Sequence, residues 1–145
     1  MKRVCLVGVL LLASVAASAQ TSQFTCSDAV SVTVSTITTA GNTQIVAAPN
    51  LGRAANLFIC SYSVQVTEGA TPYTFQLVSG SGTNCATATA PLTVSATGAA
   101  SSSPSVGAVF SSDGAIKVPA NAAVCLSLGG VVNASSVNIR YMLGR

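Results

Sequence analysis

The stretch that decides the fold is residues 56–68, which read NLFICSYSVQVTE. Apolar and polar residues alternate along it with a period of two, which is the pattern of a half-buried β-strand and not of a helix. The alternation resumes in residues 73–77 after a turn at residues 68–72, so we predict a β-hairpin over residues 56–79. The side chains expected on one face of its first strand are Phe58, Cys60, Tyr62, Val64 and Val66.

The rest of the chain repeats this pattern in short pieces. Further strands are expected at residues 30–35, 43–47, 92–96, 106–110, 115–118, 122–128 and 136–143, with Gly, Pro and Asn between them. No segment carries the apolar spacing of an amphipathic helix. We therefore predict an all-β fold, an antiparallel β-sandwich of jelly-roll or Greek-key type, with a closed barrel as the alternative. No internal repeat is visible, so residues 20–145 are expected to form a single domain.

The N-terminus has the features of a secretory signal peptide. Lys2 and Arg3 precede an apolar run over residues 4–17, which ends in the small residues of Ala17-Ser18-Ala19. Cleavage near Ala19 would release a secreted, periplasmic or cell-surface protein. A membrane anchor is the alternative, but the run is too short to cross a bilayer stably, and residues 20–23 are polar.

Four cysteines remain after that cleavage: Cys26, Cys60, Cys85 and Cys125. An even number in a small exported chain predicts two disulfides. Four cysteines allow three pairings, of which we favour Cys26–Cys85 with Cys60–Cys125, because Cys60 and Cys125 both lie in the middle of expected strands. A metal site is the alternative, but the chain has no histidine and no CxxC pair.

Charge is scarce, at 6% of residues against about 25% in ordinary soluble domains. After cleavage the chain would keep four basic residues, Arg53, Lys117, Arg140 and Arg145, and three acidic ones, Asp28, Glu68 and Asp113. Nucleic-acid binding is not expected, because it needs clustered Lys and Arg. Low net charge also removes long-range self-repulsion, which favours association with a protein surface or with like molecules. No membrane span is expected beyond the N-terminal run.

The chain lacks the side chains that ordinary enzyme chemistry uses. The absence of histidine removes Ser-His-Asp and Cys-His machinery, and the thiols are expected to be oxidised. Glu68 with Asp113 could in principle form a carboxylate pair, yet each precedes a glycine and is better explained as a turn residue. We therefore predict no catalytic residue, no bound metal and no cofactor, and we do not expect an enzyme.

Two loops are the best candidates for a binding surface. They are residues 79–84, which read SGSGTN, and residues 98–104, which are rich in Gly, Ala and Ser. The first lacks the ending of a phosphate-binding loop. Tyr73, just after a turn proline, is the aromatic side chain expected to be exposed, whereas Tyr62 and Tyr141 lie on the apolar phase of their strands. The predicted binding residues are Tyr73, Ser81, Thr83 and Asn84, with a glycan as a candidate ligand.

Three segments resemble a known group of proteins. Residues 58–63 (FICSYS), 75–85 (FQLVSGSGTNC) and 121–127 (NAAVCLS) are similar to a pattern in small exported or phage-associated β-sandwich proteins. The resemblance spans roughly residues 43–143. It implies a compact β-sandwich with a structural role at a surface or in a virion, and it implies no catalytic residues, since no activity is established for the group.

The composition also resembles that of pilus subunits, which are exported, poor in charge and disulfide-bonded. Such subunits assemble by adding a strand to a neighbour, and residues 28–38 would supply that strand here. The leading hypothesis is an exported, non-enzymatic structural or surface-interaction module, which pairs through a strand edge in an extracellular, envelope or virion-like assembly. The alternatives are a small carbohydrate- or ligand-binding domain and a pilus-like fibre subunit.

Overall fold

The computed structural model describes residues 25–49, 56–67, 69 and 71–144. Within these ranges the chain forms ten β-strands, and its helical segments are three single turns of 3₁₀ helix. The strands are β1 (Val30–Ser35), β2 (Gly41–Val46), β3 (Asn56–Thr67), β4 (Tyr73–Ser81), β5 (Thr87–Pro91), β6 (Ala96–Gly98), β7 (Ser105–Val109), β8 (Ile116–Val118), β9 (Ala123–Gly129) and β10 (Ala134–Gly144). The 3₁₀ turns are η1 (Cys26–Asp28), η2 (Thr83–Cys85) and η3 (Ser112–Gly114). The predicted all-β class is confirmed.

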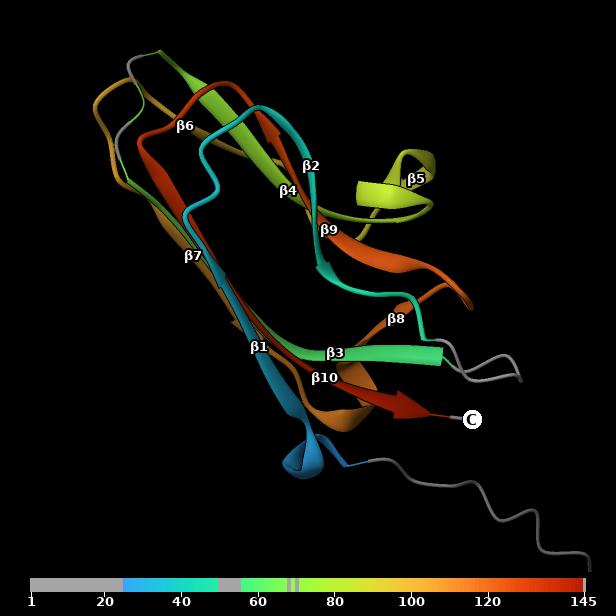
Figure 1. Cartoon of the computed structure of the whole chain (residues 1–145). Helices are drawn as coiled ribbons and strands as arrows, with labels where there is room; N and C mark the ends of the chain where they lie inside the picture. The colour runs from blue at the N-terminus through green and yellow to red at the C-terminus, as the bar shows by residue number, and fades with distance from the viewer. Residues whose placement is uncertain (1–24, 50–55, 68, 70, 145) are drawn as a thin grey trace, which may run out of the picture.

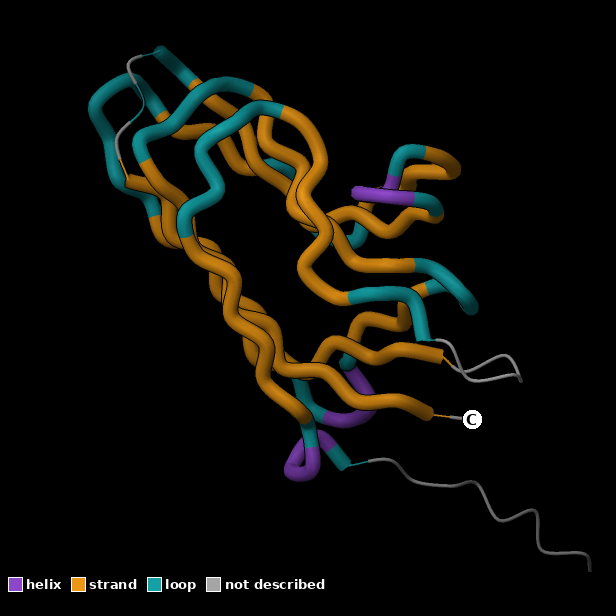
Figure 2. The backbone as a smooth tube through the Cα atoms, viewed as in Figure 1, coloured by secondary structure: helices purple, strands orange, loops and turns teal. Residues whose placement is uncertain are grey.

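The strands form two antiparallel sheets that lie face to face (Figures 1 and 2). Sheet A has the order β1-β10-β3-β7, with β8 also paired to β3, and sheet B has the order β2-β9-β4-β5, with β6 also paired to β4. The strands occupy eight positions if β5 with β6, and β7 with β8, are each counted as one. The first position pairs with the eighth, the second with the seventh, the third with the sixth and the fourth with the fifth. This nested order is that of a jelly roll. The predicted sandwich is therefore confirmed, and the closed barrel is not formed.

Two of the predicted local structures are wrong. β3 and β4 do not form a hairpin, because β3 lies beside β10 in sheet A and β4 lies beside β9 in sheet B. Residues 92–95 are not a strand but connect β5 to β6, and the N–H groups of Leu92 and Thr93 both donate to the Leu77 carbonyl. A tight hairpin and a connection that crosses between sheets use the same turn residues, so the sequence pattern does not separate them.

The side-chain alternation of β3 changes phase at Cys60. The register with β10 shifts between Arg140 and Tyr141, which leaves Cys60 as the extra residue of a β-bulge. The apolar residues of β3 in the core are Leu57 and Ile59 before the bulge and Val64 and Val66 beyond it. The single face predicted over residues 58–66 is therefore correct only on the C-terminal side of the bulge.

The main core lies between the two sheets. Its buried side chains come from every long strand and include Leu57, Ile59, Val64, Tyr73, Phe75, Leu77, Val124, Leu126, Val137 and Ile139. A second, smaller cluster covers the outer face of sheet B, where Val78, Cys85, Ala123 and Cys125 pack together. Burying both faces of β4 and β9 at this end accounts for the nearly continuous burial along these two strands.

Two disulfides form, as predicted, but the favoured pairing is wrong. The bonds are Cys26–Cys60 and Cys85–Cys125, with Cα–Cα distances of 5.6 and 6.3 Å. Cys60 and Cys125 both lie within strands, as predicted, but in opposite sheets, and each bonds to a cysteine in a 3₁₀ turn. Two disulfides are consistent with an extracellular or otherwise oxidising location. No helix in the described part of the chain is long and apolar enough to cross a membrane.

Candidate functional site

Tyr73 is not the exposed aromatic that the sequence predicted. Its side chain is 1% exposed and belongs to the main core, and its hydroxyl donates a hydrogen bond of 2.7 Å to the Ser102 carbonyl. A Cβ atom on Gly98 would lie 2.3 Å from the Tyr73 ring, and one on Gly69 would lie 2.8 Å from it. The position after the turn proline places Tyr73 at the first residue of β4, where it faces inward and closes one end of the sandwich.

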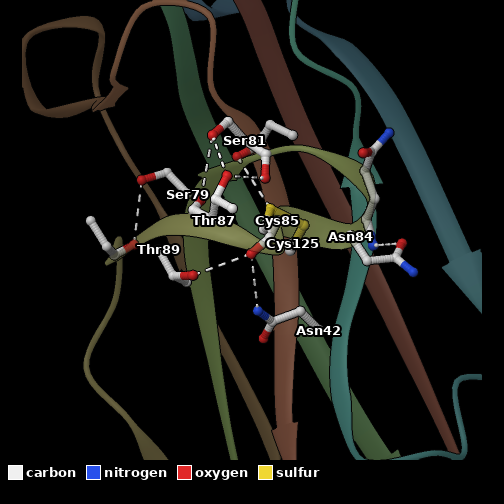
Figure 3. The surroundings of a disulfide bond; sticks show 11 residues. Asn42, Ser79, Ser81, Asn84, Cys85, Thr87, Thr89 and Cys125 are labelled. Carbon is white, nitrogen blue, oxygen red and sulfur yellow. Dashed lines mark hydrogen bonds between the residues drawn. A yellow bond between two sulfur atoms is a disulfide. The ribbon is translucent and has the colours of Figure 1, made fainter.

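The predicted binding loop at residues 79–84 is held by hydrogen bonds within the chain (Figure 3). The hydroxyl groups of Ser81 and Thr87 are hydrogen-bonded to each other at 2.9 Å, and the Thr87 hydroxyl also donates to the Ser81 carbonyl. The Asn84 side-chain oxygen accepts the backbone N–H of Gln44 on β2. Ser81, Thr83 and Asn84 are exposed, as a binding loop requires, but two of the three have structural roles that explain their presence.

The same loop is also held by the Cys85–Cys125 disulfide, which links its C-terminal end to β9. Asn42 on β2 and Thr89 on β5 both donate to the Cys85 carbonyl, at 3.4 and 3.2 Å. A Cβ atom on Gly80 would lie 2.7 Å from the Cys85 Cβ, so the glycine allows η2 to lie directly against β4. The loop, the disulfide and strands β2, β4, β5 and β9 therefore form one cross-linked unit on the outer face of sheet B.

The second predicted loop, residues 98–104, closes the end of the sandwich around Tyr73. The Ser101 N–H donates to the Gly69 carbonyl at 2.9 Å, and the Ser102 hydroxyl donates to the Ala99 carbonyl at 2.6 Å. Pro104, just before β7, accepts the Val66 N–H at 3.1 Å. The predicted residues thus lie in two separate places, with Tyr73 under this loop and the other three beside the buried disulfide.

An open groove that the sequence did not predict lies where the edges of the two sheets meet. It has a volume of about 610 Å³ and runs between the β5–β6 connection of sheet B and strands β7 and β8 of sheet A. Its lining is mostly apolar and includes Tyr62, Leu92, Val94, Ala108, Phe110 and Ile116. The Tyr62 and Phe110 rings lie 6.2 Å apart. The polar groups in it include the side chains of Gln76 and Thr93, and both bond to backbone groups within the chain.

Strand β7 borders this groove and is the outermost strand of sheet A on that side. The Pro104 carbonyl accepts from Val66 and the Phe110 N–H donates to the Cys60 carbonyl, so the residues of even number face β3. Backbone groups alternate in direction along an antiparallel strand. The N–H and C=O groups of Ser105, Gly107 and Val109 therefore point away from the sheet.

The surroundings of this edge are uncharged and include two exposed valines. Val109 on β7 is 86% exposed and Val94, across the groove, is 91% exposed. Neither β7 nor the β3 residues paired with it, 61–65, include a charged side chain. An uncharged edge strand with unpaired backbone groups is a template for pairing with another chain.

Within ranges 25–49, 56–67, 69 and 71–144, no three potential metal-ligating side chains come together. Asp28 lies in η1 and Asp113 in η3, in separate turns of the chain. Glu68, which could in principle have formed a carboxylate pair with Asp113, lies outside the described residues.

A jelly roll alone does not assign a function, since this topology occurs in capsid proteins, lectins and enzymes. The features that discriminate are local, namely the open groove and the free edge of β7 beside it. Comparison of the chain with models of protein families, with curated proteins and with solved structures found no match.

Proposed function

We propose that this chain is an exported, non-enzymatic structural or surface-interaction module that works in an extracellular, envelope or virion-like assembly. The observation that carries the proposal is the β7 edge, where three residues direct unpaired backbone groups outward beside exposed valines. Soluble proteins usually protect such an edge with a charge, a proline or a covering loop. An edge left open and uncharged is suited to pairing with a partner strand.

The distribution of polar groups supports a non-enzymatic role. No buried side-chain nitrogen or oxygen among the described residues lacks a hydrogen-bond partner. Buried Ser79 and Ser135, for example, donate to the carbonyls of Ala90 and Ile37. Active sites commonly hold polar groups that the fold itself leaves unsatisfied. With no histidine in the chain, these hydroxyls also lack the usual general base.

Two further features support export and assembly. The N-terminal residues 1–19 have the pattern of a cleaved signal peptide, and the two disulfides suit an oxidising compartment. The resemblance to exported or phage-associated β-sandwich proteins favours a structural role in the same way. A pilus-like subunit is less favoured, because β1, part of the segment that would be donated, is paired with β10 of its own chain along all six of its residues.

The groove supports a second candidate, a small ligand-binding domain. Its volume of about 610 Å³ lies within the range of small-molecule sites, about 300–1,000 Å³. Tyr62 and Phe110 could stack against a sugar ring, and the hydroxyl of Thr93 lies in the same groove. A glycan bound in this way would lie at the junction of the sheet edges and not at Tyr73 or at residues 81–84.

The test is the location and physical state of the chain in its native genetic context. A culture is separated into cytoplasm, envelope, released particles and clear supernatant, and the chain is followed by mass spectrometry. We expect the form beginning near Gln20 in sedimentable material outside the cytoplasm, and a Ser105→Lys/Val109→Lys variant shifted to the clear supernatant. Recovery of the unchanged chain solely as free monomer, with saturable binding on a glycan array that Tyr62→Ala abolishes, would support the ligand-binding alternative instead.

A further inference from the structure

We infer that β7 pairs with β7 of a second copy of this chain, antiparallel and about a two-fold axis at Gly107, so that sheet A continues from one copy into the other. The inference rests on the proposed function and names the partner at its interaction surface. It starts from the backbone: Ser105, Gly107 and Val109 direct their N–H and C=O groups away from β3.

The register follows from which residues face outward. An antiparallel pairing centred on Gly107 sets Ser105 opposite Val109 of the other copy and Gly107 opposite its own counterpart. Each of these residues is outward-facing, so each opposed pair can exchange two hydrogen bonds, about six in all. A pairing centred on Val106 or Ala108 would make that residue a non-hydrogen-bonded pair and would leave two opposed pairs of outward-facing residues within the strand, about four hydrogen bonds. Gly107 is therefore the best centre for a symmetric pairing.

The side chains allow two copies to approach. β7 reads SVGAV, with a glycine at its centre and no residue larger than valine. Because the strand and its β3 partners are uncharged, bringing two identical edges together opposes no like charges. Val109, which is 86% exposed, would lose part of its contact with water to Ser105 of the other copy.

The other sheet edges are less suited to self-pairing. Lys117 is exposed in β8, and β5 ends at Pro91. The edge strand β2 has a bulge after Gln44, whose N–H is already bonded to Asn84. In β1, Ser31 lies opposite Arg140, and Asp28 precedes the strand by two residues. β6 also lacks these features, but it has three residues against the five of β7, so β7 is the longer uncharged edge among the described strands.

A five-residue strand buries little area, so the pair is expected to be weak and concentration-dependent. The measurement is sedimentation of the disulfide-bonded mature chain over about a hundredfold range of concentration. Ser105→Lys/Val109→Lys places ammonium groups opposite each other at both ends of the strand pair and should weaken association at least about tenfold. The matched control, Val30→Lys/Val131→Lys, adds the same charge at exposed positions away from β7 and should associate like the unchanged chain.

Residue-resolved amide exchange shows where the copies meet and keeps the test independent of the charge change. The N–H groups of Ser105, Gly107 and Val109 should become protected as concentration rises. A chain that stays monomeric throughout, or one whose association leaves these amides unprotected and survives the double lysine change, would overturn the inference. If the isolated chain is monomeric while its recovery in sedimentable material still depends on β7, the proposed function stands and the partner is a different protein.

Discussion

The two edges of sheet A are built from similar sequences and have different surroundings. β1 reads VSVTVS and β7 reads SVGAV, both uncharged and both rich in valine. β1 follows directly on η1, where the Cys26–Cys60 disulfide ties it to β3, and the Arg140 guanidinium lies 3.5 Å from the Cys26 carbonyl. The residues of β7 have no disulfide or ionic group, and the strand lies beside the open groove.

The comparison indicates that an edge strand's behaviour depends on the residues around it more than on its own composition. At β1, a disulfide and a charged side chain lie beside the strand, and we expect both to restrict its motion and its access to another chain. At β7, the backbone is available and the neighbouring side chains are uncharged. Changes that alter the surroundings of one edge should therefore make it behave more like the other.

The largest effect is expected from removing the disulfide that holds β1. Cys26→Ala/Cys60→Ala should lower the free energy of unfolding by about 2–4 kcal/mol, because the bond closes a loop with a sequence separation of 34 residues. Denaturant unfolding measures the loss, and amide exchange should show β1 opening more often than β3. An unchanged midpoint would show that β10 alone suffices to hold β1.

A smaller effect is expected from crowding β7 against β3. A Cβ atom on Gly107 would lie 2.7 Å from the Tyr62 carbonyl oxygen, so Gly107→Ala should cost about 1–3 kcal/mol through strain. Gly114→Ala is the matched control, since its Cβ would lie 3.4 Å from its nearest neighbour, the Ser111 hydroxyl. Thermal unfolding of both variants measures the difference in stability. Equal midpoints for the two variants would mean that β7 does not lie this close to β3.

The connection that leads into β7 gives a third, smaller effect. Tyr73→Phe removes the hydrogen bond to the Ser102 carbonyl and should lower stability by about 0.5–1.5 kcal/mol while the core stays filled. Amide exchange should rise in residues 98–104 and not in η2. Tyr62→Phe serves as the comparison, because no hydrogen bond is found for the Tyr62 hydroxyl within the described residues. A stability loss as large at Tyr62 would contradict this role for Tyr73.

The smallest effect on stability is expected from neutralising the charge beside β1. Arg140 is exposed, so Arg140→Gln should change the unfolding free energy by less than about 0.5 kcal/mol. It should nevertheless make β1 a better pairing edge. Sedimentation should then show slightly more association than is seen for the unchanged chain. Combining this change with Ser105→Lys/Val109→Lys isolates the part of the association that occurs through β1. No added association would mean that the disulfide alone protects β1.

Much of the fold could be predicted because β-strand patterning is local. Alternation located most strands and identified the all-β class, and the even cysteine count predicted two disulfides. The pairing of β3 with β10, far apart in the chain, could not be read from any local pattern. The disulfide pairing failed for the same reason, since it depends on which sheet each cysteine joins. The bulge at Cys60 shifted the phase of β3 without a sequence signal.

The candidate site was harder to predict than the fold. Residues 79–84 looked like a binding loop because glycine and hydroxyl residues are common in such loops, yet the same residues satisfy the backbone around Cys85. Tyr73 looked exposed because it follows a turn, although its strand phase was that of buried Phe75 and Leu77. The groove and the β7 edge arise only when sheets A and B are assembled, so no single segment indicates them.

The most direct test of the account is the amide-exchange pattern of β7 in the dilute, disulfide-bonded chain. Because β7 is an open edge, Val106, Ala108 and Phe110 should exchange slowly and Ser105, Gly107 and Val109 rapidly. Slow exchange at all six residues in the monomer would mean that another part of the chain covers this edge. That result would contradict the central claim that the uncharged edge of sheet A is free to bind a partner.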